Sequence, residues 1–113
     1  MGARAVGGGE FVAYVGDADI HDGTIVDIQR QGDRIGVVIQ GAGWQRPSGC
    51  RFVVEFLGVQ SVKSNRPIGM TLYSLSEMKS DSPFRRFVFA NWHDEDDASL
   101  EIVAREFRVL ETA

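Results

Sequence analysis

The chain has 113 residues, of which 43% are hydrophobic and 25% are charged. These figures fit one globular domain of ordinary composition and leave no room for a second. Sixteen acidic and twelve basic residues give a net charge of −4, the wrong sign for a protein that binds nucleic acid through its overall field. The composition therefore argues against two-domain architectures and against nucleic acid as a partner.

Targeting and redox signals are few. No apolar run approaches the eighteen residues of a membrane-spanning helix, and residues 1–10 lack the apolar core of a signal peptide. The chain is expected to be cytoplasmic, with no membrane partner. Cys50 is the only cysteine, which rules out an internal disulfide and a cysteine-built zinc site. We expect a half-buried thiol beside a loop.

The N-terminal segment differs from the rest of the chain. Residues 1–9 carry four glycines and no apolar pattern, so we predict a flexible leader over 1–9 and a single β-rich domain over 10–113. From Glu10 onward the apolar residues mostly alternate, and the runs are rich in valine, isoleucine and phenylalanine, which favour strands.

A hairpin is the first predicted element. Apolar side chains alternate with polar ones at Thr24, Val26 and Ile28, and again at Ile35, Val37 and Ile39. The residues between the two runs, Gln31-Gly32-Asp33, have turn chemistry. The pattern predicts two antiparallel strands joined by a tight turn.

A glycine-rich stretch over 41–49 is predicted to be a loop. The next strand, over 51–57, places Phe52, Val54 and Phe56 on one face. Gly58 breaks that run, and 59–62 continues it after a bend or bulge. The strand is expected to end at 64–67.

The C-terminal half contains three further runs. Residues 84–92 are apolar on both faces, which is typical of a central strand. Leu100, Ile102 and Ala104 alternate, but the phase slips at Arg105-Glu106 before Phe107 and Val109, which predicts a β-bulge there. Residues 70–79 fit either a helix or a strand. We favour the strand because only four residues separate this segment from the next run.

These elements predict a mainly β fold. Seven or eight short antiparallel strands would form a single meander that closes into a barrel or folds into a two-layer sandwich. A helix near 70–79 would make the fold α+β instead.

Two histidines, each followed by aspartate, are the candidate metal ligands. His21, Asp22, His93 and Asp94 would suit a divalent transition metal held by two imidazoles and a carboxylate. No motif brings the two pairs together. We therefore favour a turn at 21–23, in which Asp22 caps backbone amides and Gly23 takes a positive φ. No cofactor and no metal are expected, and a metal-dependent enzyme or metal binder using His21 and His93 is the alternative.

Acidic residues concentrate near the C-terminus. Residues 93–111 hold seven acidic and two basic residues, a net charge of −5, and four carboxylates are consecutive: Asp94, Glu95, Asp96 and Asp97. An EF-hand would need glycine where Ser99 stands and glutamate where Arg105 stands, so a calcium loop is excluded. The cluster is interpreted as a solvated turn or as a surface for a basic partner.

Arg30 and Arg34 have the RxxxR spacing of the PilZ nucleotide-binding barrels, but the second PilZ element does not follow. They are expected to flank the 31–33 turn as solvent-facing charges.

Trp44, between glycines and Pro47, is the tryptophan expected to be exposed and to contact a partner. Trp92, at a strand end, fits core packing equally well.

No nucleophile elbow, phosphate-binding loop or dinucleotide fingerprint occurs in the chain. The sequence thus predicts a non-catalytic binding domain that engages a protein partner through Trp44 and the acidic turn. A homodimer through a sheet edge is compatible with this interpretation.

The run 20–28, the hairpin after it and the run 52–59 together resemble the opening of a group of small bacterial β-rich domains of unknown function. Some members of that group resemble immunity proteins of toxin systems. The resemblance covers about residues 20–62 and implies no catalytic residue. The inserted loop around Trp44 departs from the pattern.

Overall fold

The computed structural model describes residues 11–15, 19–43, 50–80, 83–93 and 95–112. These ranges contain seven strands and no helix: β1 Phe11–Tyr14, β2 Thr24–Gln31, β3 Arg34–Gln40, β4 Arg51–Asn65, β5 Leu72–Met78, β6 Arg85–Asn91 and β7 Ser99–Thr112. The predicted mainly β fold is confirmed. Residues 72–78 form a strand, so the alternative of a helix near 70–79 is wrong. The predicted leader, 1–9, lies outside the described residues.

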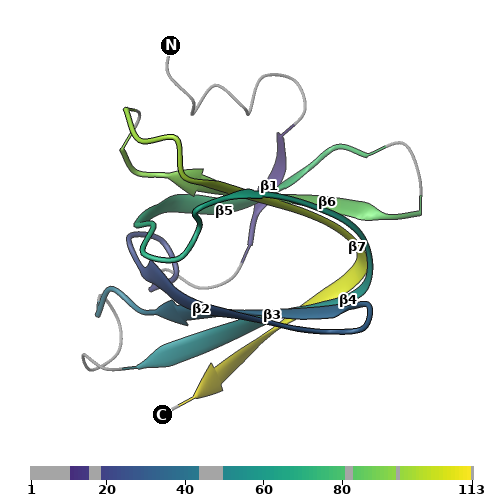
Figure 1. The fold of residues 1–113 in the computed structure, drawn as a ribbon, viewed down its shortest axis with the longest axis horizontal. Helices are drawn as coiled ribbons and strands as arrows, with labels where there is room; N and C mark the ends of the chain where they lie inside the picture. Colours follow the sequence, from purple (N-terminus) through teal and green to yellow (C-terminus); the bar gives the residue numbers. More distant parts are fainter. Residues whose placement is uncertain (1–10, 16–18, 44–49, 81–82, 94, 113) are drawn as a thin grey trace.

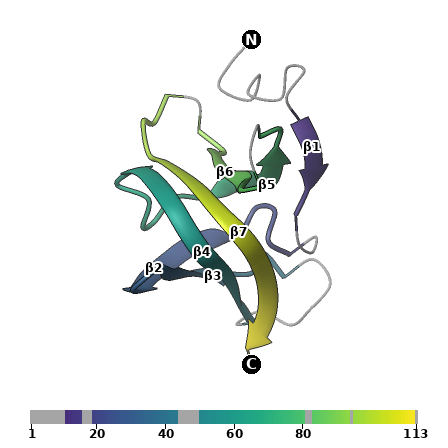
Figure 2. The ribbon, with the colours of Figure 1, turned by 90° about the vertical axis from the view of Figure 1, so that its right-hand side faces the viewer.

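All seven strands belong to one antiparallel sheet, in the order β1-β5-β6-β7-β4-β3-β2. Two three-stranded meanders, β2-β3-β4 and β5-β6-β7, are joined through the pairing of β4 with β7. Figure 1 shows the two meanders as layers, one above the other, with β4 and β7 curving from one layer into the other. Figure 2 shows β4 and β7 side by side along this curve. The fold is thus a two-layer sandwich made from one continuous sheet.

The other side of the sandwich is tied by a few backbone contacts. Thr24 and Thr71 form an isolated antiparallel bridge, and the Leu72 N–H donates to the Gly23 carbonyl at 2.8 Å. These bonds connect the start of β2 to the start of β5 without closing the sheet.

The core lies between the two layers. Its centre is a group of phenylalanine rings: the ring centroid of Phe56 is 5.1 Å from that of Phe87 and 5.9 Å from that of Phe89. The predicted inward residues of three strands are all buried: Ile35, Val37 and Ile39 in β3; Phe52, Val54 and Phe56 in β4; Leu100, Ile102 and Ala104 in β7. Period-two alternation therefore identified most of the core correctly.

β4 and β7 have 15 and 14 residues, and β4 continues through a bend at Gly58, as predicted. Gly58 has a φ of 65°, and both strands change their inward phase here. Register pairs Leu57 with Glu106 and Val59 with Ala104, so neither strand gains a residue across the bend. The bulge predicted at Arg105-Glu106 is wrong: the phase slip is a bend that the two strands share.

The strand pairing also contains register shifts, one of them directly after the bend. The β4–β7 register shifts between Val59 and Ser61. A second shift falls between Ile25 and Asp27 in β2, which fully buries Ile25 instead of the predicted Thr24 and Val26. The predicted phase at the start of β2 is therefore wrong, because a bulge reverses which residues face the core.

β6 occupies the third position in the sheet order, between β5 and β7. Phe87 and Phe89 are buried, and Val88 and Ala90 on the opposite face are half-buried. The prediction of a central strand over 84–92 is confirmed. Trp92, directly after β6, is 44% exposed and lies outside the core.

Two glycines with similar φ values test the importance of the shared bend. A Cβ at Gly58 would lie 3.0–3.1 Å from the Arg105 side chain, whereas a Cβ at Gly32 (φ 61°) would meet nothing within 4 Å. Alanine in the left-handed region costs about 1–2 kcal/mol at either position. We expect Gly58→Ala to lower the free energy of unfolding in urea by more than Gly32→Ala. Equal losses would show that contact with Arg105 plays no part in the bend.

Candidate functional site

A tight turn before β2 fixes the first residues of the site. Asp22 has a φ of 72°, and its N–H donates to the Leu72 carbonyl at 2.9 Å. The predicted positive φ at Gly23 is wrong, because Asp22 carries it. Gly23 is required for space: a Cβ there would lie 2.8 Å from the Gln40 backbone oxygen.

The Asp22 carboxylate does not cap backbone amides as predicted. Within the described part of the chain it forms neither a hydrogen bond nor an ion pair. Its backbone is held on two sides, by the bond to Leu72 and by the bond from the Gly23 N–H to the Ile20 carbonyl at 3.0 Å. The turn therefore presents, on a backbone that is held in place, a carboxylate with no partner among the described residues.

Aromatic side chains surround this carboxylate. A depression of about 330 Å³ is lined by Tyr14, His21, Asp22, Tyr73, Ser74 and Trp92. We call it the aromatic depression. Its residues come from β1, the 19–22 turn, β5 and the residue that follows β6. The backbone N–H of Trp92 donates to the Thr71 carbonyl at 2.9 Å, which ties this residue to the start of β5. The sheet thus brings together residues that are far apart in the sequence.

The rings form two contacting pairs. Tyr14 and His21 meet edge to face at 5.3 Å between ring centroids, and Tyr73 and Trp92 lie tilted at 5.5 Å. The exposed fraction is 60% for Tyr14, 37% for Tyr73 and 44% for Trp92. Phe11, 41% exposed, packs 4.8 Å from Tyr14 and extends the surface. Exposed aromatic residues gathered in one place are typical of a binding surface.

Sequence reasoning missed the roles of Tyr14 and Tyr73. Strict alternation would put Tyr73 on the same face as the buried Leu75, and the register shift between Leu72 and Ser74 turns it outward instead. Two outward tyrosines on different strands do not indicate a site by themselves. They come close to each other only because β1 pairs with β5, which sets Tyr14 against Ser76. Trp44, the tryptophan predicted to contact a partner, lies outside the described residues.

The predicted acidic turn, which we define as residues 93–97, follows Trp92 directly. Asn91 organises it: its Nδ2 donates to the Ala98 carbonyl at 3.2 Å, and its Oδ1 accepts from the His93 N–H at 2.9 Å. Glu95, Asp96 and Asp97 are exposed, and Asp94 lies outside the described residues.

Arg66 neutralises part of this turn. Its guanidinium forms ion pairs with Asp97 and, at 3.4 Å, with Asp96. The neighbouring Asn65 donates from Nδ2 to the Asp97 carbonyl at 2.9 Å. Two of the four predicted carboxylates therefore already have a basic partner within the chain, which weakens their field toward an external one.

The Asp96 carboxylate also stabilises the turn. Its Oδ1 accepts from the Ala98 N–H at 3.2 Å. This bond, followed by the Asn91 side chain and the Arg66 guanidinium, holds the pKa of Asp96 below its usual value. The charged form is thus favoured by the folded chain.

The two histidines line different depressions. His21 borders the aromatic depression, whereas His93 borders another of about 250 Å³ that includes Asp96 and Asp97. Among the described residues no three His, Cys, Asp or Glu side chains are grouped to hold a metal ion. His21, Asp22 and His93 therefore form no such group.

Cys50 is half-buried, as predicted, and its Sγ lies 3.5 Å from Glu111 Oε2.

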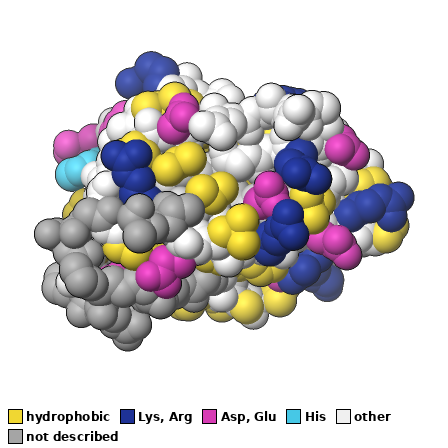
Figure 3. Space-filling model, turned by 90° about the horizontal axis from the view of Figure 1, so that it is seen from below, with side chains coloured by type: hydrophobic (Ala, Val, Ile, Leu, Met, Phe, Trp, Pro, Cys, Tyr) yellow, Lys and Arg dark blue, Asp and Glu magenta, His cyan; other side chains and the backbone are white. Residues whose placement is uncertain are grey.

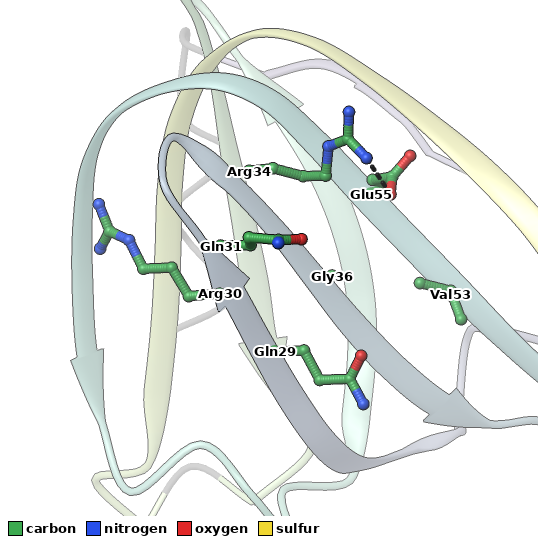
Figure 4. Close-up of a pocket in the computed structure, with 7 residues that line it drawn as sticks. All are labelled: Gln29, Arg30, Gln31, Arg34, Gly36, Val53 and Glu55. Carbon is green, nitrogen blue, oxygen red and sulfur yellow. Dashed lines mark ion pairs between the residues drawn. The ribbon is translucent and has the colours of Figure 1, made fainter.

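A third depression, of about 400 Å³, lies on the outer face of the β2–β3–β4 layer (Figure 4). Gly36 leaves space between the side chains of the flanking strands. Glu55 accepts from Arg108 Nε at 2.6 Å and lies 3.9 Å from Arg34. Arg30 points away from Glu55 in Figure 4. Arg30 and Arg34 are exposed beside the turn, which confirms the prediction of solvent-facing charges.

The same outer face carries both signs of charge. Figure 3, seen from below, shows hydrophobic side chains across its middle and intermixed basic and acidic side chains on its right-hand side. Arg34 and Arg108 pair with the same carboxylate, Glu55. Their half-exposed ion pairs are surface interactions of small net value. This face offers a less distinctive site than the aromatic depression.

No protein-family model matches the chain, and no curated protein or solved structure is significantly similar to it. Within the described residues, no helix has the length and apolar character needed to cross a membrane.

Acid titration tests the role of Asp96. Because its pKa is lower in the folded chain, its stabilising effect is present above the unfolded value of 3.8 and is lost as the pH falls through the folded value. Asp96→Asn keeps Oδ1 as an acceptor for Ala98 but cannot ionise. We expect the melting temperature of the native chain to exceed that of the variant at about pH 6 and the two to converge at about pH 2. Parallel curves over this range would contradict the role assigned to the charge.

Proposed function

We propose that the chain is a non-catalytic binding domain that holds a basic segment of a protein partner on the aromatic depression and the acidic turn. The observation that supports this most directly is the Asp22 carboxylate, which lies between exposed aromatic rings on a held backbone and has no partner among the described residues. Trp92 connects the two surfaces, since it lines the depression and precedes the turn. Aromatic residues contribute contact area, and the carboxylates contribute attraction and orientation.

The relative importance of the two surfaces follows from their charges. Asp96 and Asp97 are paired with Arg66, whereas the described residues that line the depression around Asp22 include no lysine or arginine. The aromatic depression is therefore the main contact, and Glu95 with the rest of the turn attracts the partner over longer range. The role of Trp44 stays a prediction.

The sheet edges bear on self-association. β2, one edge, is irregular, and its Asp27 Oδ1 accepts from the Ile28 N–H at 2.9 Å, which protects one edge amide. β1, the other edge, exposes all four of its residues. A homodimer through a sheet edge would therefore use β1.

A cytoplasmic location, a bacterial origin and an immunity-type role stay predictions, as does the alternative of metal chemistry at His21 and His93.

A peptide array tests the proposed function. Fifteen-residue peptides rich in lysine and arginine are compared with acidic and neutral peptides of matched length, and binding of labelled protein is measured. We expect basic peptides to be selected and Trp92→Ala to weaken their binding at least about tenfold, the change typical of a central aromatic contact.

Ile68→Ala serves as the matched control, because Ile68 is an exposed apolar residue, 58% exposed, that does not line the depression. It should leave binding unchanged. Both variants should melt close to the native chain, since neither side chain lies in the core. Equal loss in both variants, or no selection of basic peptides, would refute the proposal.

A further inference from the structure

The aromatic depression combines a large area of ring surface with one carboxylate. Among the described residues that line it, four are aromatic, and the others are Asp22 and Ser74. Ser74 is buried, and its Oγ lies 3.3 Å from Ser76 Oγ, within hydrogen-bond distance. The charged acceptor among these residues is therefore the Asp22 carboxylate, and the hydroxyls of Tyr14 and Tyr73 add weaker, neutral acceptors.

This composition restricts the charge of a ligand. The faces of tyrosine and tryptophan rings carry a negative quadrupole that attracts cations. The carboxylate adds a negative charge at the same place, and the part of the lining that the structure describes has no lysine or arginine to oppose it. An anion would meet repulsion from both, so the depression favours a cation.

The hydration of the ligand restricts the cation further. A lysine ammonium brings three N–H donors and an arginine guanidinium brings five. Contact with ring faces takes water away from these donors, and each donor left without a partner costs free energy. A quaternary ammonium has no N–H donor, so ring faces and one carboxylate satisfy it fully.

The site is also formed before any ligand arrives. The Asp22 backbone is held by its bond to Leu72, and Gly23 packs too closely against β3 to shift. Tyr73 and Trp92 already contact each other at 5.5 Å. Little conformational entropy therefore has to be lost on binding.

We infer that the aromatic depression binds a quaternary ammonium group, with the rings of Tyr14, Tyr73 and Trp92 around the methyl groups and Asp22 as the counter-ion. The inference rests on the proposed function, since it uses the same depression and specifies which cation it prefers. The group is either the head of a trimethylated lysine in a partner protein or that of a free small molecule such as choline.

Titration with paired probes tests the inference. Choline and its neutral isostere 3,3-dimethylbutan-1-ol are titrated into the full chain, and the indole N–H signal of Trp92 is followed by NMR. We expect saturable binding of choline and none of the isostere at tenfold higher concentration. Asp22→Asn, which tolerates the positive φ, should weaken choline binding about fivefold or more. Asp33→Asn, at the β2–β3 turn, should leave it unchanged.

A second pair of probes identifies the source of the cation. A trimethyllysine peptide is compared with the unmodified peptide of the same sequence. Tighter binding of the methylated peptide than of choline supports a protein partner, and equal affinities support a free quaternary amine. Preference for the unmodified peptide would overturn the inference while leaving the proposed function intact. Binding of choline with no binding of any cationic peptide would support the cation site and refute the protein partner.

Two variants guard against a folding artefact. Trp92→Ala and Tyr14→Leu each remove one exposed ring, and both should abolish choline binding with little change in melting temperature. Because Trp92→Ala lacks the indole that serves as the NMR reporter, binding to both variants and to the native chain is also measured by isothermal titration calorimetry. Equal binding of choline and the neutral isostere, or no change in either variant, would overturn the inference.

Discussion

The pairing of β4 with β7 determines the architecture. The two strands pair from Arg51 opposite Thr112 to Asn65 opposite Ser99, with one register shift between Val59 and Ser61, and each belongs to a different three-stranded meander. Because both strands bend at Gly58, the sheet turns back over itself and brings the two inward faces together. The phenylalanine cluster is buried only as a result of this bend, and burial of that cluster is the main source of stability available to a chain of this size.

The candidate site depends on the same geometry at its other end. Folding the sheet over brings the start of β2 against the start of β5, where Asp22 bonds to Leu72. That contact places the 19–22 turn beside Tyr73, and pairing of β1 with β5 adds Tyr14. The site therefore lies where the two layers meet opposite the shared bend, which explains why its residues come from four separate segments.

Much of the fold could be predicted because alternation is a local signal. Residues such as Val37, Val54 and Ile102 face inward because every second residue of a flat strand does so. The failures occur where two strands act together: the slip at Arg105 looks like a bulge until Gly58 opposite it is seen to bend as well. Less of the candidate site could be predicted from the sequence. His21 and Asp22 stood out by their chemistry, but their association with Tyr14 and Tyr73 arises from long-range pairing that no local pattern contains.

Among the strands of the described residues β1 is the shortest, and it is joined to β5 by three register pairs and by the Val15 N–H, which donates to the Leu75 carbonyl at 2.8 Å. It also supplies Tyr14, the most exposed ring of the depression. A molecule that touches Tyr14 therefore adds a bond between β1 and the rest of the sheet, and by thermodynamic linkage its occupancy lowers the population of chains in which this strand has detached. Detachment would expose the edge of β5, with which strands of other molecules can pair. A ligand held at Tyr14 would in this way couple binding to resistance against aggregation through the four residues of β1.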